Sequence, residues 1–298
     1  MKYLIITFTS ILLSTSIVWA QVGYIDTLNG PPSAFELIHN GDKLKVSPFK
    51  QLYPGDQIRI RKKTNKLFAD KENYLTLAFA NSQFVTLRYV DTQDSPYRVG
   101  KHRNTISILN NIFNLTSQWV SALYLDHVQT LSIQTKGQDN EIATLSMPIL
   151  TGHEAKLLAG KRQLHLAWQG GKPPYQVSLY RTDQRVPLWV KNALTATTAI
   201  LEKRDISVGG YQIIVTDAQG KQVIGEFTAV ADTTILTAAE IRLLEQSQLS
   251  AATKKTLQAS WLAHQAGWYW EAYQQVSEIK DYYPAVLVKT GLAAGLYP

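Results

Sequence analysis

No cysteine occurs among the 298 residues, which excludes disulfides, thiolate chemistry and a cysteine-linked lipid anchor. A glycine-rich phosphate loop, a nucleophile elbow and a His-Glu-x-x-His string are also absent. The histidines lack the spacing of metal ligands along the chain; they are His39, His102, His127, His153, His165 and His264. From these absences we expect a protein that is not an enzyme and that holds no metal and no cofactor.

Two short strings match those of penicillin-recognising enzymes, and we interpret both as chance. Ser47-Pro48-Phe49-Lys50 fits the Ser-x-x-Lys pattern, but it lies in a proline-flanked turn region rather than at the start of a helix. Lys289-Thr290-Gly291 fits the second pattern, but its Ala- and Leu-rich surroundings predict a helix instead of the required strand. A cell-wall hydrolase would need acidic residues, such as Asp42 and Asp56, to converge in space.

The N-terminal segment has the three parts of an export signal. Lys2 supplies a positive charge, Tyr3 to Val18 is uncharged and largely apolar, and Val18-Trp19-Ala20 places small residues at the cleavage positions. An uncleaved membrane anchor is the alternative, but a comfortable span needs about 20 consecutive apolar residues. We therefore expect a signal peptide over residues 1–20, cleavage before Gln21, and a periplasmic or secreted protein. The lack of cysteine favours a bacterial periplasm.

The net charge of +7 is mildly basic and dispersed. The densest basic run, Arg59-Ile60-Arg61-Lys62-Lys63, is typical of a solvated strand end and loop. Export removes the usual nucleic-acid ligand, so we expect no nucleic acid as a partner. Contact with an anionic membrane surface of the envelope remains an alternative.

Residues 21–149 are expected to form a β domain. Apolar and polar residues alternate through Gln57 to Arg61, Tyr74 to Phe79 and Phe84 to Tyr89, which predicts antiparallel strands. Turns are predicted at Pro54-Gly55-Asp56 and at Asn81-Ser82, because these residue types accept the backbone angles that turns require.

A helix near residues 105–123 is expected to be attached to this β domain. Apolar residues recur there at helical spacing, and Asn104 or Thr105 is available as an N-cap. The apolar stripe consists of Ile106, Leu109, Ile112, Phe113, Val120 and Leu123. We expect this stripe to pack on the sheet.

The string Leu52-Tyr53-Pro54-Gly55-Asp56-Gln57-Ile58, followed by Tyr74-Leu75-Thr76-Leu77 and Asn81 to Leu87, resembles the FecR-type periplasmic β domain. The resemblance covers roughly residues 22–99 and implies a module that senses or docks in the periplasm. The cytoplasmic segment and membrane helix of that family are missing, and Asn81-Ser82 replaces its Asp-Gly-Ser turn. The resemblance therefore implies a periplasmic sensing or docking module rather than direct control of a sigma factor.

Residues 150–234 predict a small β-sandwich of short strands separated by turns. Leu166-Ala167-Trp168 with Pro174-Tyr175-Gln176-Val177, and then Val208-Gly209-Gly210-Tyr211, resemble the strands of immunoglobulin-like bacterial modules. The resemblance implies a tyrosine corner formed by Tyr211. Trp168 and Tyr175 are candidates for a sugar-stacking platform, with core packing as the alternative that alternation favours for Trp168.

Residues 235–298 lack strand signals and predict four short helices separated at Gly267, Pro284 and Gly295. Thr237 with Glu240 predicts a capping box at the start of the first helix. The spacing of Gly267, Tyr269, Ala272 and Pro284 resembles one partial tetratricopeptide repeat, and a single unit must cover its apolar face with another part of the chain or with a partner.

Aromatic residues crowd this helical segment. Among them, Trp268, Tyr269, Trp270 and Tyr273 are the predicted partner-binding residues, because aromatic side chains are favoured anchors at interfaces. The alternative is that they form the core of a helical hairpin.

Taken together, these patterns predict a mainly β protein with an α-helical C-terminus: a FecR-like domain, an immunoglobulin-like sandwich and C-terminal helical hairpins. The expected function is that of an exported, non-catalytic adaptor or sensor in the bacterial cell envelope that binds a protein partner in signalling or assembly. Binding of carbohydrate or peptidoglycan is the alternative. The sequence leaves the oligomeric state and the identity of the partner open.

Overall fold

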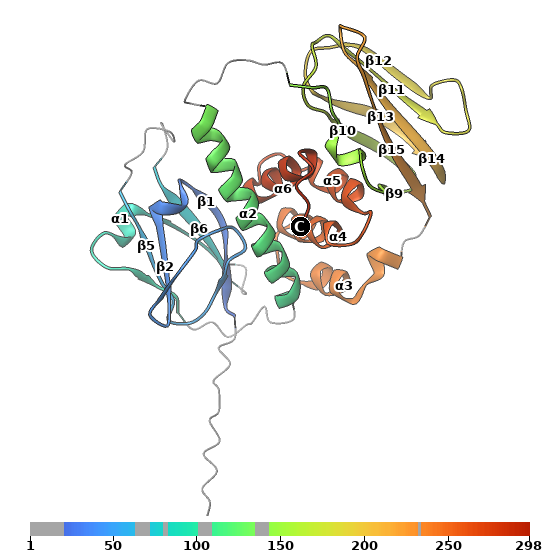
Figure 1. Ribbon diagram of the computed structural model, residues 1–298. Helices are drawn as coiled ribbons and strands as arrows, with labels where there is room; N and C mark the ends of the chain where they lie inside the picture. The colour runs from blue at the N-terminus through green and yellow to red at the C-terminus, as the bar shows by residue number, and fades with distance from the viewer. Residues whose placement is uncertain (1–20, 63–71, 80–82, 101–108, 135–142, 232–233) are drawn as a thin grey trace, which may run out of the picture.

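The computed structural model describes residues 21–62, 72–79, 83–100, 109–134, 143–231 and 234–298. The predicted signal peptide, the Asn81-Ser82 turn and the N-cap candidates Asn104 and Thr105 lie outside these ranges. Two β domains lie on opposite sides of a group of helices from the C-terminal segment, and a long helix runs between the first β domain and this group (Figure 1). The mainly β architecture with a helical C-terminal segment is therefore confirmed.

Two four-stranded sheets make up the N-terminal β domain. In the order of their hydrogen-bonded neighbours, the first contains β4 (Gln51–Leu52), β1 (Gly23–Asn29), β6 (Tyr74–Phe79) and β7 (Phe84–Arg88). The second contains β3 (Asp42–Leu44), β2 (Phe35–His39), β5 (Gln57–Ile60) and β8 (Tyr97–Arg98). The inward residues of these strands, such as Leu37, Ile58 and Leu77, are fully buried. A short helix, α1 (Tyr89–Thr92), follows β7.

The predicted turn at Pro54-Gly55-Asp56 forms. Gly55 adopts φ +92°, and the Asp56 carboxylate accepts from the Tyr53 amide at 2.9 Å. The same carboxylate lies 2.6 Å from Nδ1 of His39 on β2. Asp56 thus fixes the turn to the neighbouring strand, whereas Asp42, the other acidic residue considered for hydrolysis, is exposed on β3.

The predicted helix is longer than expected and has contacts on two sides. α2 spans Asn110–Gln134, so it continues well beyond residue 123. Phe113 packs on Tyr24 of β1 with ring centroids 4.9 Å apart, as expected for contact with the sheet. The helix also packs on α4 (Ala251–Ala263) and α6 (Tyr283–Ala293). Among the described residues, no helix combines the length and the hydropathy needed to cross a membrane.

The second β domain has two sheets. The five-stranded sheet has the order β12 (Trp189–Leu194), β11 (Tyr175–Arg181), β14 (Gly209–Thr216), β15 (Gln222–Val230) and β9 (Lys156–Leu158), and β15 pairs with β9 in parallel. The two-stranded sheet pairs β10 (Gly160–Ala167) with β13 (Thr198–Ile206). A 3-10 turn at Pro148–Leu150 precedes this domain and packs on β15, α5 and α6.

Three aromatic side chains in this domain can be compared with the predictions made from the sequence. The hydroxyl of Tyr211 donates to the carbonyl of Ser207 at 2.8 Å, as expected of a tyrosine corner. Trp168 and Tyr175 are both buried and pack edge to face with centroids 5.4 Å apart. The core-packing alternative is confirmed for both, and a sugar-stacking platform formed by these rings is wrong.

Four helices form the C-terminal segment, as predicted: α3 (Ala239–Gln246), α4, α5 (Tyr269–Ser277) and α6. The predicted capping box at Thr237 is wrong, because the N-cap of α3 is Ala238, which makes no side-chain cap bond. Gly267 (φ +83°) precedes α5, and Pro284 lies in the first turn of α6, where a missing amide proton is tolerated. The Lys289-Thr290-Gly291 string lies on α6 and not on a strand, which fits its interpretation as chance.

Candidate functional site

The four aromatic residues predicted to bind a partner contact this chain instead. Trp268, Trp270 and Tyr273 are 7%, 0% and 4% exposed, and Tyr269 is half-buried. The idea that their rings form a free docking surface is therefore corrected. The second β domain folds back onto α5 through strands β9 and β10 and covers the face that a lone hairpin would have left open.

Ring contacts show how these side chains connect the helices to the β domain. Trp270 stacks on Tyr273 with centroids 5.5 Å apart and also contacts Phe227 of β15 at 6.1 Å. Tyr269 packs on Tyr297, near the C-terminus, at 4.1 Å. Aromatic pairs at these separations add favourable energy beyond the burial of their surface. The aromatic cluster is thus an internal joint.

A buried ion pair lies beside this aromatic joint. Arg162 of β10 forms two contacts with the Glu271 carboxylate of α5, at 2.6 and 3.3 Å. Glu271 also accepts from the Leu158 amide at 3.0 Å, and Arg162 donates to the Leu158 carbonyl at 3.2 Å. The paired geometry matches the planar guanidinium to the carboxylate, which makes the contact directional as well as strong.

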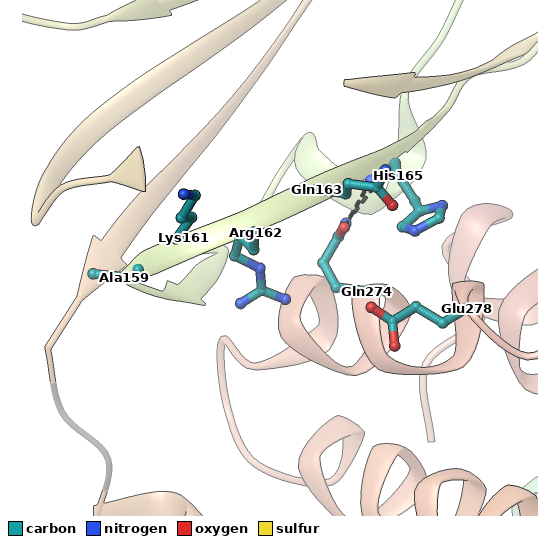
Figure 2. A pocket seen from close by; sticks show the side chains of 8 residues that line it. Ala159, Lys161, Arg162, Gln163, His165, Gln274 and Glu278 are labelled. Atoms are coloured by element: carbon teal, nitrogen blue, oxygen red, sulfur yellow. Dashed lines mark hydrogen bonds between the residues drawn. The ribbon is translucent and has the colours of Figure 1, made fainter. Parts of the chain in front are cut away.

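A second polar contact joins the side chain of Gln274 to the backbone of β10. The His165 amide donates to Oε1 of Gln274 at 2.8 Å, and Nε2 of Gln274 donates to the His165 carbonyl at 3.0 Å (Figure 2). These are the two bonds that a neighbouring peptide group would make in a sheet. Gln274 therefore acts as a short substitute for a paired strand at this one position.

A cleft of about 310 Å³ opens between β10 and α5 next to this contact. Its lining is predominantly polar, and it comprises Ala159, Gly160, Lys161, Arg162, Gln163, His165, Gln274 and Glu278. In Figure 2, Arg162 points toward α5, whereas Lys161 leaves the strand on the other side. The cleft brings together residues that lie more than a hundred positions apart in the chain.

The floor of the cleft is an open strand edge. The register between β10 and β13 shifts between Arg162 and Leu164, but the extra residue lies on β13 and β10 keeps its alternation. Because the backbone groups of His165 point toward Gln274, those of Gln163 and Lys161 therefore point the same way. Strand β13 pairs with the opposite side of β10, through Leu164↔Leu201 and Arg162↔Arg204. The Gln163 and Lys161 backbone groups therefore face the cleft without a strand beside them in the described chain.

The charges around the cleft are unevenly compensated. Glu278 pairs with Lys255 at 2.9 Å, and this hydrogen bond lowers the pKa of the Glu278 carboxyl. Burial lowers the pKa of His165, which favours its neutral form. Lys161 is exposed and forms no ion pair with the described residues. Beside the cleft, β10 thus carries one lysine that forms no ion pair with the described residues, and its neighbour across the sheet is Asp205 of β13.

Two side-chain nitrogen atoms on β10 have unused hydrogen-bonding capacity. Nε of Arg162 and Nε2 of His165 are both buried and have no partner in the described structure. Buried polar atoms without partners are uncommon in folded proteins, and each can pair with an ordered water or with a further polar group. Within the described residues, no His, Cys, Asp and Glu side chains gather as a metal site would require. The two nitrogens and the polar lining are suited to bind polar groups.

Few features of the sequence indicated the residues of this cleft. His165 stood out only as a histidine on the polar side of a predicted strand, and Arg162, Glu271 and Gln274 gave no motif. A polar residue on the otherwise apolar face of a short helix was the available signal for Glu271 and Gln274. Its meaning depends on contacts over 109 positions of sequence, which a single sequence does not reveal.

A separate buried polar group joins the first β domain to the helices. The hydroxyl of Tyr282, the N-cap of α6, donates to the Asp26 carboxylate of β1 at 2.8 Å, and Thr253 of α4 donates to the same hydroxyl at 3.3 Å. Burial raises the pKa of Asp26, because the charged form loses its hydration. The C-terminal helices are thus bonded to both β domains.

Comparisons with known proteins do not name a family. No protein-family model matches the chain, and no curated protein matches it. Among solved structures, CopC from Methylosinus trichosporium OB3b is similar over 30% of this chain and 90% of its own, with 18% sequence identity and a TM-score of 0.21. A likeness at this level gives no information on what the chain binds.

Proposed function

We propose that the protein is an exported, non-catalytic adaptor of the bacterial cell envelope that holds a protein partner in the cleft between β10 and α5. The observation that carries this proposal is the open backbone edge of β10 at Gln163 and Lys161, which lies beside a helix whose Gln274 already makes peptide-like bonds to His165. An exposed strand edge is a template for pairing with another chain.

The finer domain assignments belong to the same proposal. The parallel pairing of β15 with β9 and the tyrosine corner at Tyr211 support an immunoglobulin-like sandwich. The turn fixed by Asp56 and the β6–β7 hairpin support a FecR-like domain over residues 22–99. Export rests on residues 1–20, and N-terminal sequencing of the mature protein checks it: a first residue of Gln21 is expected.

Binding of carbohydrate or peptidoglycan has less support than binding of a protein. The aromatic rings that suggested sugar stacking, Trp168 and Tyr175, form part of a core. The cleft is polar, and its lining holds backbone groups of β10 and, among the described residues, no Phe, Tyr or Trp ring. Backbone groups in a row are matched best by another polypeptide.

Site-specific photo-crosslinking in the native envelope tests the proposal. A benzoylphenylalanine at Gln163 is compared with the same residue at Ile200, which lies opposite His165 on β13 of the same sheet. We expect an ultraviolet-dependent adduct at Gln163 alone, in which mass spectrometry maps the crosslink to one segment of one partner protein. Equal adducts at both positions, or none at Gln163, would refute a partner in this cleft.

A further inference from the structure

We infer that the partner supplies a short extended segment that adds to β10 as a new strand, with an acidic residue opposite Lys161; this inference rests on the adaptor function proposed above. It names the binding mode, the length of the segment and its chemistry. Each of these follows from a different feature of the edge.

The binding mode follows from the backbone geometry. Along one edge of a strand, the amide and carbonyl groups available for pairing recur at every second residue, about 6.6 Å apart. On β10 these residues are His165, Gln163 and Lys161, and Gln274 occupies the first of them. An added strand completes the remaining two positions with main-chain hydrogen bonds.

The length follows from what limits the edge at each end. The Gln274 side chain closes the edge at His165, so the added strand ends there. At the other end Gly160 adopts φ +136°, a conformation outside the β region, and the chain turns toward β9. Between these limits the edge accommodates roughly three to four residues of a partner. A segment this short gains little from the backbone alone, so its side chains must contribute.

The chemistry of those side chains follows from Lys161. On an added strand, the residue opposite Lys161 directs its side chain to the same face of the sheet, where opposite charges at this spacing attract each other. Glu278 is paired with Lys255 and Glu271 with Arg162, while Asp205, the neighbour of Lys161 on β13, forms no ion pair with it. An aspartate or glutamate from the partner therefore meets a lysine that no described carboxylate holds.

The two unused nitrogens offer additional contacts. Nε of Arg162 is a donor, and Nε2 of His165 donates or accepts according to its tautomer. Both belong to β10 beside the cleft, and they lie one and two residues from Gln163, which is at the middle of the open edge. Carbonyl or hydroxyl groups of an extended segment are suitable partners for both atoms.

A selection from a phage library of random octapeptides tests the inference directly. The library is panned against the purified chain, and the enriched peptides are then synthesised with a fluorescein label for polarisation measurements. We expect enriched peptides to share one acidic position within a run of β-forming residues. Failure to enrich any peptide, or enrichment of basic peptides, would overturn the inference.

Two variants locate the binding to the edge. Gln163→Pro removes an amide donor that does not take part in the β10–β13 ladder, and proline is tolerated at such edge positions. Ile200→Pro is the matched control, because Ile200 lies opposite His165 and its backbone also points away from the ladder, on the far edge. We expect about tenfold weaker peptide binding for Gln163→Pro and less than about twofold change for Ile200→Pro. Equal effects would place the peptide elsewhere.

A charge reversal keeps the inference testable if the proline variant folds poorly. Lys161→Glu changes one exposed side chain, and it should shift the preference of a new selection from acidic to basic peptides. An unchanged preference would remove Lys161 from the recognition. If the crosslink at Gln163 maps to a partner while no peptide is selected, the adaptor function stands and strand addition falls. If neither is seen, both fall.

Discussion

The buried pair between Arg162 and Glu271 should carry much of the energy that holds the second β domain on α5. The Glu271 side chain is 4% exposed and that of Arg162 is 22% exposed. Arg162→Met leaves a buried carboxylate whose remaining described partners are the Leu158 amide and the side chain of Gln275. Loss of one partner of a buried pair costs about 3–5 kcal/mol, and the partial exposure of Arg162 places this variant at about 3 kcal/mol.

The complementary variant should cost less. Glu271→Gln keeps a carbonyl oxygen that can accept from the Leu158 amide, and the partly exposed Arg162 regains some hydration. We expect a loss of about 1–2 kcal/mol. The double variant should be no less stable than Arg162→Met alone, which corresponds to a coupling of about 1–2 kcal/mol between the two side chains.

Urea unfolding gives the global stabilities, and native-state hydrogen exchange at the Leu158 amide gives the local one. A loss of about 3 kcal/mol should speed this exchange by about a hundredfold, if the joint opens as a unit. Lys255→Met is the control, because it breaks the exposed pair between Lys255 of α4 and Glu278, the C-cap of α5, and should cost less than about 1 kcal/mol. Similar losses for Arg162→Met and Lys255→Met would refute the reasoning.

Three further predictions concern the contacts of the C-terminal helices with the two β domains and with α2. Trp270→Ala should lower the free energy of unfolding by about 3–5 kcal/mol in urea titrations, because the ring is fully buried. Asp26 has a folded pKa above its ordinary 3.8, so its contribution is fully present below pH 3.8 and is lost as the pH rises through the raised value. The stability of the wild type relative to Asp26→Asn, measured by urea titrations at several pH values, should therefore fall over that window. Gly291→Ala should lower the melting temperature, because its Cβ would lie 2.5 Å from Leu123 of α2, whereas Gly100→Ala, with no atom within 4 Å of its Cβ, should not.

Local patterns allowed much of the fold to be predicted from the sequence. The four C-terminal helices were predictable because Gly267 and Pro284 interrupt a composition that favours helix. The turn at Gly55 and the role of Tyr211 were predictable because each depends on residues a few positions away. Local signals failed at α3, where Thr237 and Glu240 fit a capping box but the N-cap is Ala238.

The burial of the aromatic residues was not predictable in the same way. Considered as an isolated hairpin, the C-terminal segment has more aromatic surface than it can cover, which suggested an external partner for Trp268 and Trp270. Other parts of the same chain cover these side chains: β15 and β9 pack on α5, and the first β domain packs on α6. The decisive contacts span 109 residues at His165–Gln274 and 256 at Asp26–Tyr282, distances at which no periodic pattern is informative.

The same folding-back explains why a strand edge stays open. α5 reaches the β10 edge at His165 through Gln274 and leaves the edge uncovered toward Lys161. An uncovered edge invites pairing with a second copy of the chain, and a lysine on the edge is one of the features by which proteins resist this. In an antiparallel pair of two such edges centred on Gln163, each Lys161 would lie opposite His165 of the other copy, a position that Gln274 already occupies. Gln274 therefore disfavours self-pairing and leaves a short segment of another protein as the better occupant.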